Sequence, residues 1–307
     1  MLAAIVLMVG LLALIKAANM TITATENIAT KKGWSNYGAA TILIATMTSL
    51  PELFVSVLAA LHGDYAVVTG TVFGSVVGLL LLSLGLIGLI ANVRFTEGER
   101  ALGRKAVLTI IYVAILAIVL PAIPWFVGIL VLLGYLYYAK EATKVSDVGK
   151  KEPDGTAEGS IRKEAVTLII GIALLLGSAE AVVWSIEALA KEYGIAPFVI
   201  SFILVALGTN LPEISVEITS TLKNRAEIAL GDIVGSAVAD TTVVLGTAAI
   251  VAKTLPITMT AHVGAAILMG SALLAWKIES GKKLTMWESL GLILAYFLVI
   301  ATEMALG

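Results

Sequence analysis

Two short stretches of this sequence place a proline, a carboxylate and hydroxyl or amide side chains together inside otherwise apolar segments. Residues 48–52 read Thr-Ser-Leu-Pro-Glu, and residues 209–213 read Thr-Asn-Leu-Pro-Glu. A proline inside a helix removes one backbone donor and obstructs the carbonyl one turn earlier, so each helix should break and release carbonyls from Ala45 and Ala206 onward. Such oxygens suit Ca²⁺, Na⁺ or H⁺. They suit zinc or copper poorly, because no His or Cys lies nearby.

A second motif follows each of these stretches. Residues 70–75 read Gly-Thr-x-x-Gly-Ser, and residues 231–236 read Gly-Asp-x-x-Gly-Ser. Glycines four residues apart leave a thin helix face that another helix can approach closely. In the second copy Asp232 and Asp240 are eight residues apart, a little over two helical turns, so both can face one seam. A carboxylate in mid-membrane costs about 3 kcal/mol and is tolerated where it pairs, faces water or binds an ion.

Composition places these motifs in a membrane protein. Apolar residues make up 59% of the 307 and charged residues only 14%, whereas about a quarter of the residues in soluble domains are charged. The absence of cysteine excludes disulfides, thiolate metal sites and Cys nucleophiles. We expect the chain to sit in a lipid bilayer, to need no cofactor and to bind no nucleic acid.

Apolar runs of about twenty residues match a hydrocarbon layer of about 30 Å at 1.5 Å per helical residue. We expect ten spans, at 2–28, 36–61, 66–92, 103–120, 122–140, 163–190, 195–222, 227–252, 257–276 and 285–305. This arrangement puts 17 of the 20 Lys and Arg on one side of the membrane and two, Lys191 and Lys253, on the other, with Lys16 inside a span. The basic side is expected to be cytoplasmic, which leaves both termini outside the cytoplasm in the plasma membrane.

The chain repeats itself at an offset of 161 residues. The offset pairs Glu52 with Glu213 together with the preceding Leu-Pro, and it pairs Gly74–Ser75 with Gly235–Ser236. Each half holds five expected spans, and an odd number inverts the second copy relative to the first. The sequence thus predicts an all-α membrane protein with ten transmembrane helices as two inverted five-helix repeats, residues 1–140 and 163–307, joined by a polar cytoplasmic linker at 141–162.

At these motifs the sequence resembles the Ca²⁺/cation antiporter superfamily, and within it the prokaryotic sodium/calcium exchangers. Those proteins carry a Gly-Thr-Ser-Leu-Pro-Glu motif, then Gly-Asn-x-x-Gly-Ser, then Asn or Asp four residues after the serine. The resemblance implies a shared central site with Glu52 and Glu213 as the main divalent-cation ligands. It further implies oxygen from Thr48 and Thr209, and sodium positions built from Ser49, Ser75, Ser236, Asp240 and the carbonyls of Ala45 and Ala206.

Several positions depart from that family pattern. Met47 replaces a glycine, Asn210 stands where Ser is common, and Thr71 and Asp232 replace asparagines. Leu79, which pairs with Asp240 at the repeat offset, carries no side-chain oxygen. These changes affect the sodium positions more than the calcium position. Proton coupling, or a divalent ion other than Ca²⁺, therefore stays open. Asp232 and Asn210 are retained as candidate cation ligands.

The remaining polar residues give weaker signals. Glu217 either extends a cation pathway beyond Glu213 or faces Lys223, and Glu26 and Glu187 are expected at the membrane interface. Glu180 is expected to pair across helices, with Lys16 as one candidate partner. The two histidines, His62 and His262, are expected at the surface.

We expect an antiporter, working as a monomer, that exchanges Ca²⁺ for Na⁺ or H⁺ and is not an enzyme. An ion channel lined by the same acids, and an intramembrane hydrolase using the carboxylates as an acid/base pair, are the rival interpretations.

Overall fold

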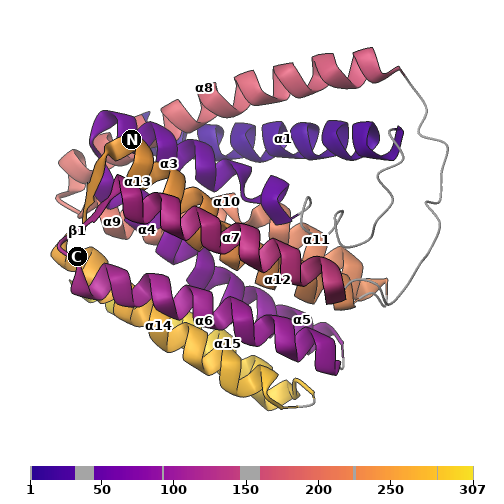
Figure 1. The fold of residues 1–307 in the computed structure, drawn as a ribbon. Helices are drawn as coiled ribbons and strands as arrows, with labels where there is room; N and C mark the ends of the chain where they lie inside the picture. The colour runs from indigo at the N-terminus through magenta and orange to yellow at the C-terminus, as the bar shows by residue number, and fades with distance from the viewer. Residues whose placement is uncertain are drawn as a thin grey trace.

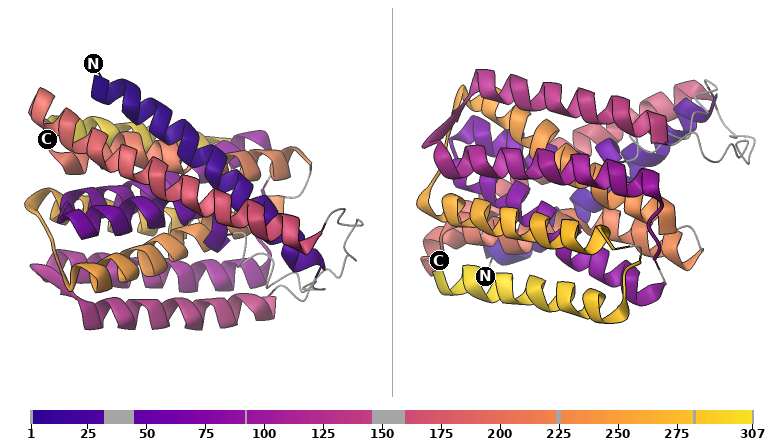
Figure 2. Two further views of the ribbon diagram at one scale, coloured as in Figure 1. Left: turned by 90° about the horizontal axis from the view of Figure 1, so that it is seen from above. Right: turned by 60° about the horizontal axis from the view of Figure 1, so that its bottom comes forward.

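The structure is a computed structural model that describes residues 2–31, 45–91, 93–145, 160–223, 226–281 and 283–306. Nearly all of the described chain is helical, and the helices run roughly along one common direction (Figure 1). The N- and C-terminal ends lie at the same end of the bundle in all three views (Figures 1 and 2). An even number of crossings is what brings both ends of a chain to one side of a membrane.

Within the described residues, seven helices are long and apolar enough to span a membrane, or eight if a pair bent by 42°, Pro197–Thr209 with Leu211–Leu222, is one span. The seven are Leu2–Thr21, Tyr65–Ile90, Glu97–Val119, Ile161–Tyr193, Ile228–Ala252, Met259–Ile278 and Met286–Ala305. Three expected spans are not among the seven: the span at 195–222 is the bent pair, and two others fall short of the criteria. The span at 36–61 begins outside the described residues and continues into α3 (Leu50–His62), and the span at 122–140 corresponds to α7 (Trp125–Val145).

The longest helices, α1 (Leu2–Lys31) and α8 (Ile161–Tyr193), lie side by side and antiparallel along one edge of the bundle (Figures 1 and 2). Small residues permit their close contact. A methyl group on Gly10 would lie 3.1 Å from Val182, and one on Gly171 would collide with Thr21. Outward-facing apolar side chains such as Met8 and Leu12 are more than 60% exposed, as expected where lipid rather than protein covers a helix.

The helix boundaries of the first half recur near the repeat offset in the second half. In chain order, the corresponding pairs are α3 and α11 (Leu211–Leu222), α4 (Tyr65–Val77) and α12 (Ala226–Ala239), η1 (Gly78–Ser83) and η3 (Asp240–Val244), α5 (Leu84–Ile90) and α13 (Leu245–Ala252), α6 (Glu97–Val119) and α14 (Met259–Glu279), and α7 and α15 (Met286–Leu306). The two η segments are π-helical turns inside longer helices. A single π turn re-aims the residues that follow it and is often found at functional sites.

Two small backbone pairings relate the halves in the same way. Strand β1 (Ala122–Pro124) pairs antiparallel with β2 (Thr254–Pro256), with Ile123 opposite Leu255. Arg94 forms an isolated antiparallel bridge with Lys283, and Leu284 donates to the carbonyl of Val93 (2.9 Å). Shifting Arg94 by the repeat offset gives Leu255, and shifting Ile123 gives Leu284. The strands lie at one end of the bundle, whereas the links from α5 to α6 and from α14 to α15 lie at the other (Figure 1).

Local signals explain where several helices begin and end. Thr96 and Glu99 form a reciprocal capping box at the start of α6, and Ser160 accepts from the Arg162 N–H at the start of α8. Gly194 ends α8 with a φ of 68°, and Gly63 ends α3 with a φ of 85°. The helices that flank the expected linker end at Val145 and begin at Ile161, and residues 146–159 between them lie outside the described part of the chain.

Candidate cation site at the centre of the bundle

Both helices that carry the Leu-Pro-Glu motif break just before the proline. Residues 45–48 are helical, Ser49 forms a turn, and α3 restarts at Leu50. In the second half α9 (Pro197–Ile200), the π-helical turn η2 (Ser201–Val205) and α10 (Ala206–Thr209) form one continuous stretch, and α11 begins after Asn210 at an angle of 42°. The prediction of proline-broken helices is confirmed at both positions, and each proline occupies the first helical turn after its break.

One group of oxygens gathers around the first break. The carbonyl of Ala45 accepts from the hydroxyls of Thr48 (3.1 Å) and Ser49 (3.2 Å), and the Ser236 hydroxyl lies 3.4 Å from the same oxygen. The Thr48 and Ser236 hydroxyls are 3.1 Å apart. Ser236 belongs to α12, so this group joins residues that are nearly 190 positions apart in the sequence. All of these side chains are buried.

A second group surrounds the other break. The Ser75 hydroxyl lies 2.7 Å from Oδ1 of Asn210 and 2.5 Å from Oδ2 of Asp240, and Nδ2 of Asn210 donates to the Ser75 carbonyl (3.0 Å). Thr209 instead donates to carbonyls of its own helix, those of Val205 and Ala206. The Ala206 carbonyl also accepts the Asn210 N–H (3.0 Å), so the break leaves it satisfied by protein donors.

Glycines of the second motif bring the two halves this close. A methyl group added to Gly74 on α4 would lie 2.8 Å from the Cβ of Ala206 and would collide with the carbonyl of Phe202. At the repeat-related position, a methyl group on Gly235 would lie 2.7 Å from the Cβ of Ala45. Each thin helix face therefore packs directly on the broken helix of the opposite half, as the glycine spacing predicts.

Five carboxylates lie in this region, and none is more than 2% exposed: Glu52, Glu213, Glu217, Asp232 and Asp240. Each has at least one buried oxygen without a hydrogen-bond partner, and in Glu52, Glu217 and Asp232 both oxygens lack one. The charge of Asp240 acts on Glu52, Glu213 and Asp232, and the charge of Asp232 acts on Glu217. No Lys or Arg among the described residues contributes to the electrostatic surroundings of these five.

Buried carboxylates without basic partners or sufficient donors are unfavourable unless a proton or a cation compensates them. The side-chain atoms of Thr48, Ser49, Ser75, Ser236 and the five carboxylates that could bind an ion are all oxygens, and Asn210 adds an amide. A set of carboxylate, hydroxyl and carbonyl oxygens suits hard cations such as Ca²⁺ and Na⁺. No trio of Glu52, Glu213 and Asp240 ligand atoms lies within 4.8 Å of one another in the described structure, so the acids surround a region rather than meet at one point.

Some polar residues lie elsewhere than the sequence indicated. Glu217 is fully buried whereas Lys223 is exposed, which favours the pathway interpretation over the ion pair. Glu180 is exposed, and its described ionic partner is His62 (3.5 Å) rather than Lys16. The side chain of Glu26 lies outside the described set. Ser83, whose buried hydroxyl adjoins Glu217, gave no signal in the sequence because it lies in an apolar run outside both motifs.

Comparison with known proteins identifies the family of this chain. A family model described as sodium/calcium exchanger protein matches residues 2–140 and 163–304. The solved structure of the sodium-calcium exchanger NCX_Mj is similar over 98% of each chain, with 26% identity and a TM-score of 0.70. The sodium/calcium exchanger MaX1 of Methanosarcina acetivorans is 25% identical over 96% of this chain and 97% of its own. The Ca(2+)/H(+) antiporter ChaA of Bacillus subtilis is 26% identical over 64% of this chain and 62% of its own.

The fold and the site together define an integral membrane transporter whose helices enclose an acidic, oxygen-lined centre. The chain belongs to the sodium/calcium exchanger family, within the Ca²⁺/cation antiporters, and it is an antiporter rather than an enzyme.

Proposed function

We propose that this protein exchanges Ca²⁺ for Na⁺ across the plasma membrane by alternating access at the central site. The proposal depends mainly on one observation. Five buried carboxylates, without a described basic partner, lie where the two broken helices meet. Glu52 and Glu213 act as the main Ca²⁺ ligands. The hydroxyls of Thr48, Ser49, Ser75, Thr209 and Ser236, the acids Asp232 and Asp240, the amide of Asn210 and the carbonyls of Ala45 and Ala206 supply the neighbouring cation positions.

The proposed topology has ten transmembrane helices in two inverted repeats, with both termini outside the cytoplasm. Three observations support it: helix boundaries that recur at the repeat offset, termini at the same end of the bundle, and equivalent backbone pairings at opposite ends. The excess of Lys and Arg on one side assigns the cytoplasmic face. A monomer contains both halves of the site, so one chain is the proposed working unit.

Coupling follows from the cost of an empty site. With no cation bound, five buried carboxylates would remain without compensation, and any rearrangement that keeps them out of water would be strongly disfavoured. Ca²⁺ or several monovalent ions remove that penalty, so only a loaded site can change its exposure. The α1–α8 pair is the proposed mobile unit because it packs along one edge of the bundle as a separate pair of long helices (Figure 1).

Proton coupling is the second candidate, and one position favours it. Leu79 is fully buried at the site related to Asp240, so the first half offers no side-chain oxygen where the second half offers a carboxylate. With fewer oxygens for monovalent cations, protons binding directly to the carboxylates become the simpler counter-ion. The similarity to a relative named a Ca(2+)/H(+) antiporter is consistent with this candidate.

Uptake of ⁴⁵Ca²⁺ into proteoliposomes tests the proposal, with Na⁺ and pH gradients imposed separately. We expect uptake that requires an outward Na⁺ gradient, saturates with Ca²⁺ and disappears in Glu213→Ala. Uptake driven only by the pH gradient would establish the second candidate. Retained Na⁺-driven uptake in a folded Glu213→Ala protein would contradict the assignment of the site.

A further inference from the structure

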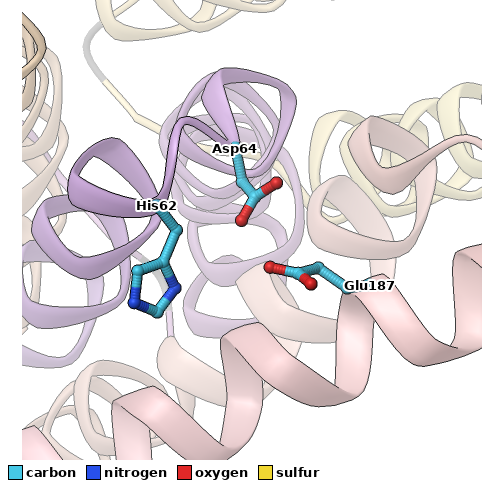
Figure 3. Close-up of side chains that lie close together, drawn as sticks. All are labelled: His62, Asp64 and Glu187. Atoms are coloured by element: carbon cyan, nitrogen blue, oxygen red, sulfur yellow. The ribbon is translucent and has the colours of Figure 1, made fainter.

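A second cluster of ligand-type side chains lies away from the central site, where α3 ends and α4 begins. His62, Asp64 and Glu187 each offer one ligand atom, and these atoms all lie within 4.8 Å of one another. Within the described residues this is the one group of three that meets that distance. Figure 3 shows the carboxylate of Asp64 pointing toward that of Glu187, with the imidazole ring of His62 beside them.

The turn that carries two of these residues is well defined. His62 is the last residue of α3, and Gly63 reverses the chain in the left-handed conformation at a φ of 85°. The N–H of Asp64 then bonds back to the carbonyl of Ala59 (2.8 Å), and its own carbonyl accepts the N–H of Val67 (2.9 Å). His62 and Asp64 are thus held on the same side of a short turn. Glu187 approaches them from α8, a different element.

Carboxylates outnumber the basic groups around Asp64. One oxygen of Asp64 is buried without a hydrogen-bond partner, and the carboxylate of Glu187 faces that of Asp64. Lys191 is the one lysine that acts on Asp64, and it acts more weakly than His62 does. His62 lies 3.5 Å from a further carboxylate, that of Glu180. Facing carboxylates repel unless a proton or a cation lies between them, so the cluster has the charge and the donors of a cation site.

We propose that His62, Asp64 and Glu187 form a binding site for a transition-metal ion of the Zn²⁺ class, separate from the transport site. One imidazole nitrogen and two carboxylate oxygens are typical zinc ligands, with a fourth position left for water. Tetrahedral bonds of about 2.1 Å place ligand atoms about 3.4 Å apart, so the trio needs only side-chain movement to close on an ion. Ca²⁺ prefers six to eight oxygen ligands, whereas zinc readily accepts an imidazole nitrogen. His62 therefore makes this cluster more suitable for zinc than for Ca²⁺.

The position of the site indicates how a bound ion would affect transport. The ion would join the turn after α3 to α8, which is half of the proposed mobile pair. It would act as a crosslink at the end of the bundle that is proposed to face away from the cytoplasm, and it would slow transport. This regulatory step rests on the proposed function, whereas binding of the metal does not.

Titration of the purified full chain with Zn²⁺ in detergent, after chelator treatment, tests the binding by calorimetry and by the shift in unfolding temperature. We expect one site that is weakened at least about tenfold in both His62→Ala and Glu187→Gln. His262→Ala is the matched control. It removes the other histidine, whose Nδ1 contacts the Thr258 carbonyl (2.8 Å) outside the cluster, and it should leave binding unchanged.

The binding proposal is overturned if Zn²⁺ binds the wild type no more tightly than it binds the two folded variants.

A transport assay tests the crosslink. Zn²⁺ added outside proteoliposomes should inhibit ⁴⁵Ca²⁺ uptake by the wild type and the His262→Ala protein but not by the His62→Ala protein. Binding at the trio without inhibition would refute the crosslink alone. Absence of any Ca²⁺ uptake would refute the proposed transport function and leave the binding result standing.

Discussion

The hydroxyls of Thr48 and Ser236 lie 3.1 Å apart across the two halves of the molecule, whereas the residues related to them by the repeat, Thr209 and Ser75, bond elsewhere. Ser75 turns to Asn210 and Asp240 because the second half supplies an amide and a carboxylate there. The first half has Ser49 and Leu79 at the matching positions. The two sides of the site are therefore chemically different, and they should hold different cations.

Ser75→Ala should weaken the Asp240 side of the site. The change removes the hydroxyl that lies within hydrogen-bonding distance of both Asn210 and Asp240 and leaves two buried polar groups short of a partner. Loss of such a bond costs about 1–3 kcal/mol. We expect a lower unfolding temperature in detergent and a higher Na⁺ concentration for half-maximal exchange. Ser271→Ala is the control, because that buried hydroxyl bonds only the Ile267 carbonyl of its own helix. Equal effects of the two substitutions would argue against a special role for Ser75.

Removing either central carboxylate should stop Ca²⁺ uptake without unfolding the protein. Glu52→Gln and Glu213→Gln keep the side-chain volume and remove one buried, uncompensated charge each. We expect background uptake of ⁴⁵Ca²⁺ by proteoliposomes and an unfolding temperature at or above that of the wild type, because a buried unpaired carboxylate is unfavourable. Glu97→Gln, at an exposed acid in the first turn of α6, should leave ⁴⁵Ca²⁺ uptake unchanged. Normal uptake by either central variant would show that the two acids are not equivalent ligands.

The glycine contacts between the halves predict a strong dependence on residue size. In Gly74→Val the new side chain would meet Ala206 and the carbonyl of Phe202, and such overpacking costs about 1–3 kcal/mol. We expect a lower yield of folded protein, a lower unfolding temperature and reduced exchange. Gly134→Val on α7 tests the specificity of the effect, because nothing lies within 4 Å of a methyl group at Gly134. The close packing is in doubt if both valines are tolerated equally.

The sequence was sufficient to predict the two helix breaks. Pro51 and Pro212 interrupt their helices because proline chemistry acts locally and needs no tertiary context. The seam formed by Gly74 and Gly235 was also readable, since four-residue spacing defines one helix face. The apolar runs predicted most of the spanning helices, because a run of about twenty apolar residues is long enough to cross a bilayer as a helix.

Other features depend on packing that a linear pattern does not encode. The π turns at Gly78–Ser83 and Asp240–Val244 have unlike sequences, GLLLLS and DTTVV, so no shared residue pattern marks them. The pairing of Asn210 with Ser75 requires the two halves to be placed in three dimensions. His62 was expected at the surface and is exposed, but its neighbour Glu187 is 125 positions away in the sequence and no periodicity connects them.

Asp64 gives the fold a pH dependence that can be measured without transport. Burial, then the nearby Glu187 carboxylate, raises the pKa of Asp64 from 3.8 to about 6. Because the folded protein holds this proton more tightly than the unfolded chain does, the contribution of Asp64 to stability is present below the unfolded pKa and is lost as pH rises through about 6. Asp64→Asn removes the titration. In the presence of a chelator, the variant's unfolding temperature relative to wild type should therefore rise with pH from about 4 to about 6 and stay level above that. A difference that does not change with pH would mean that Asp64 titrates alike in the folded and unfolded chains.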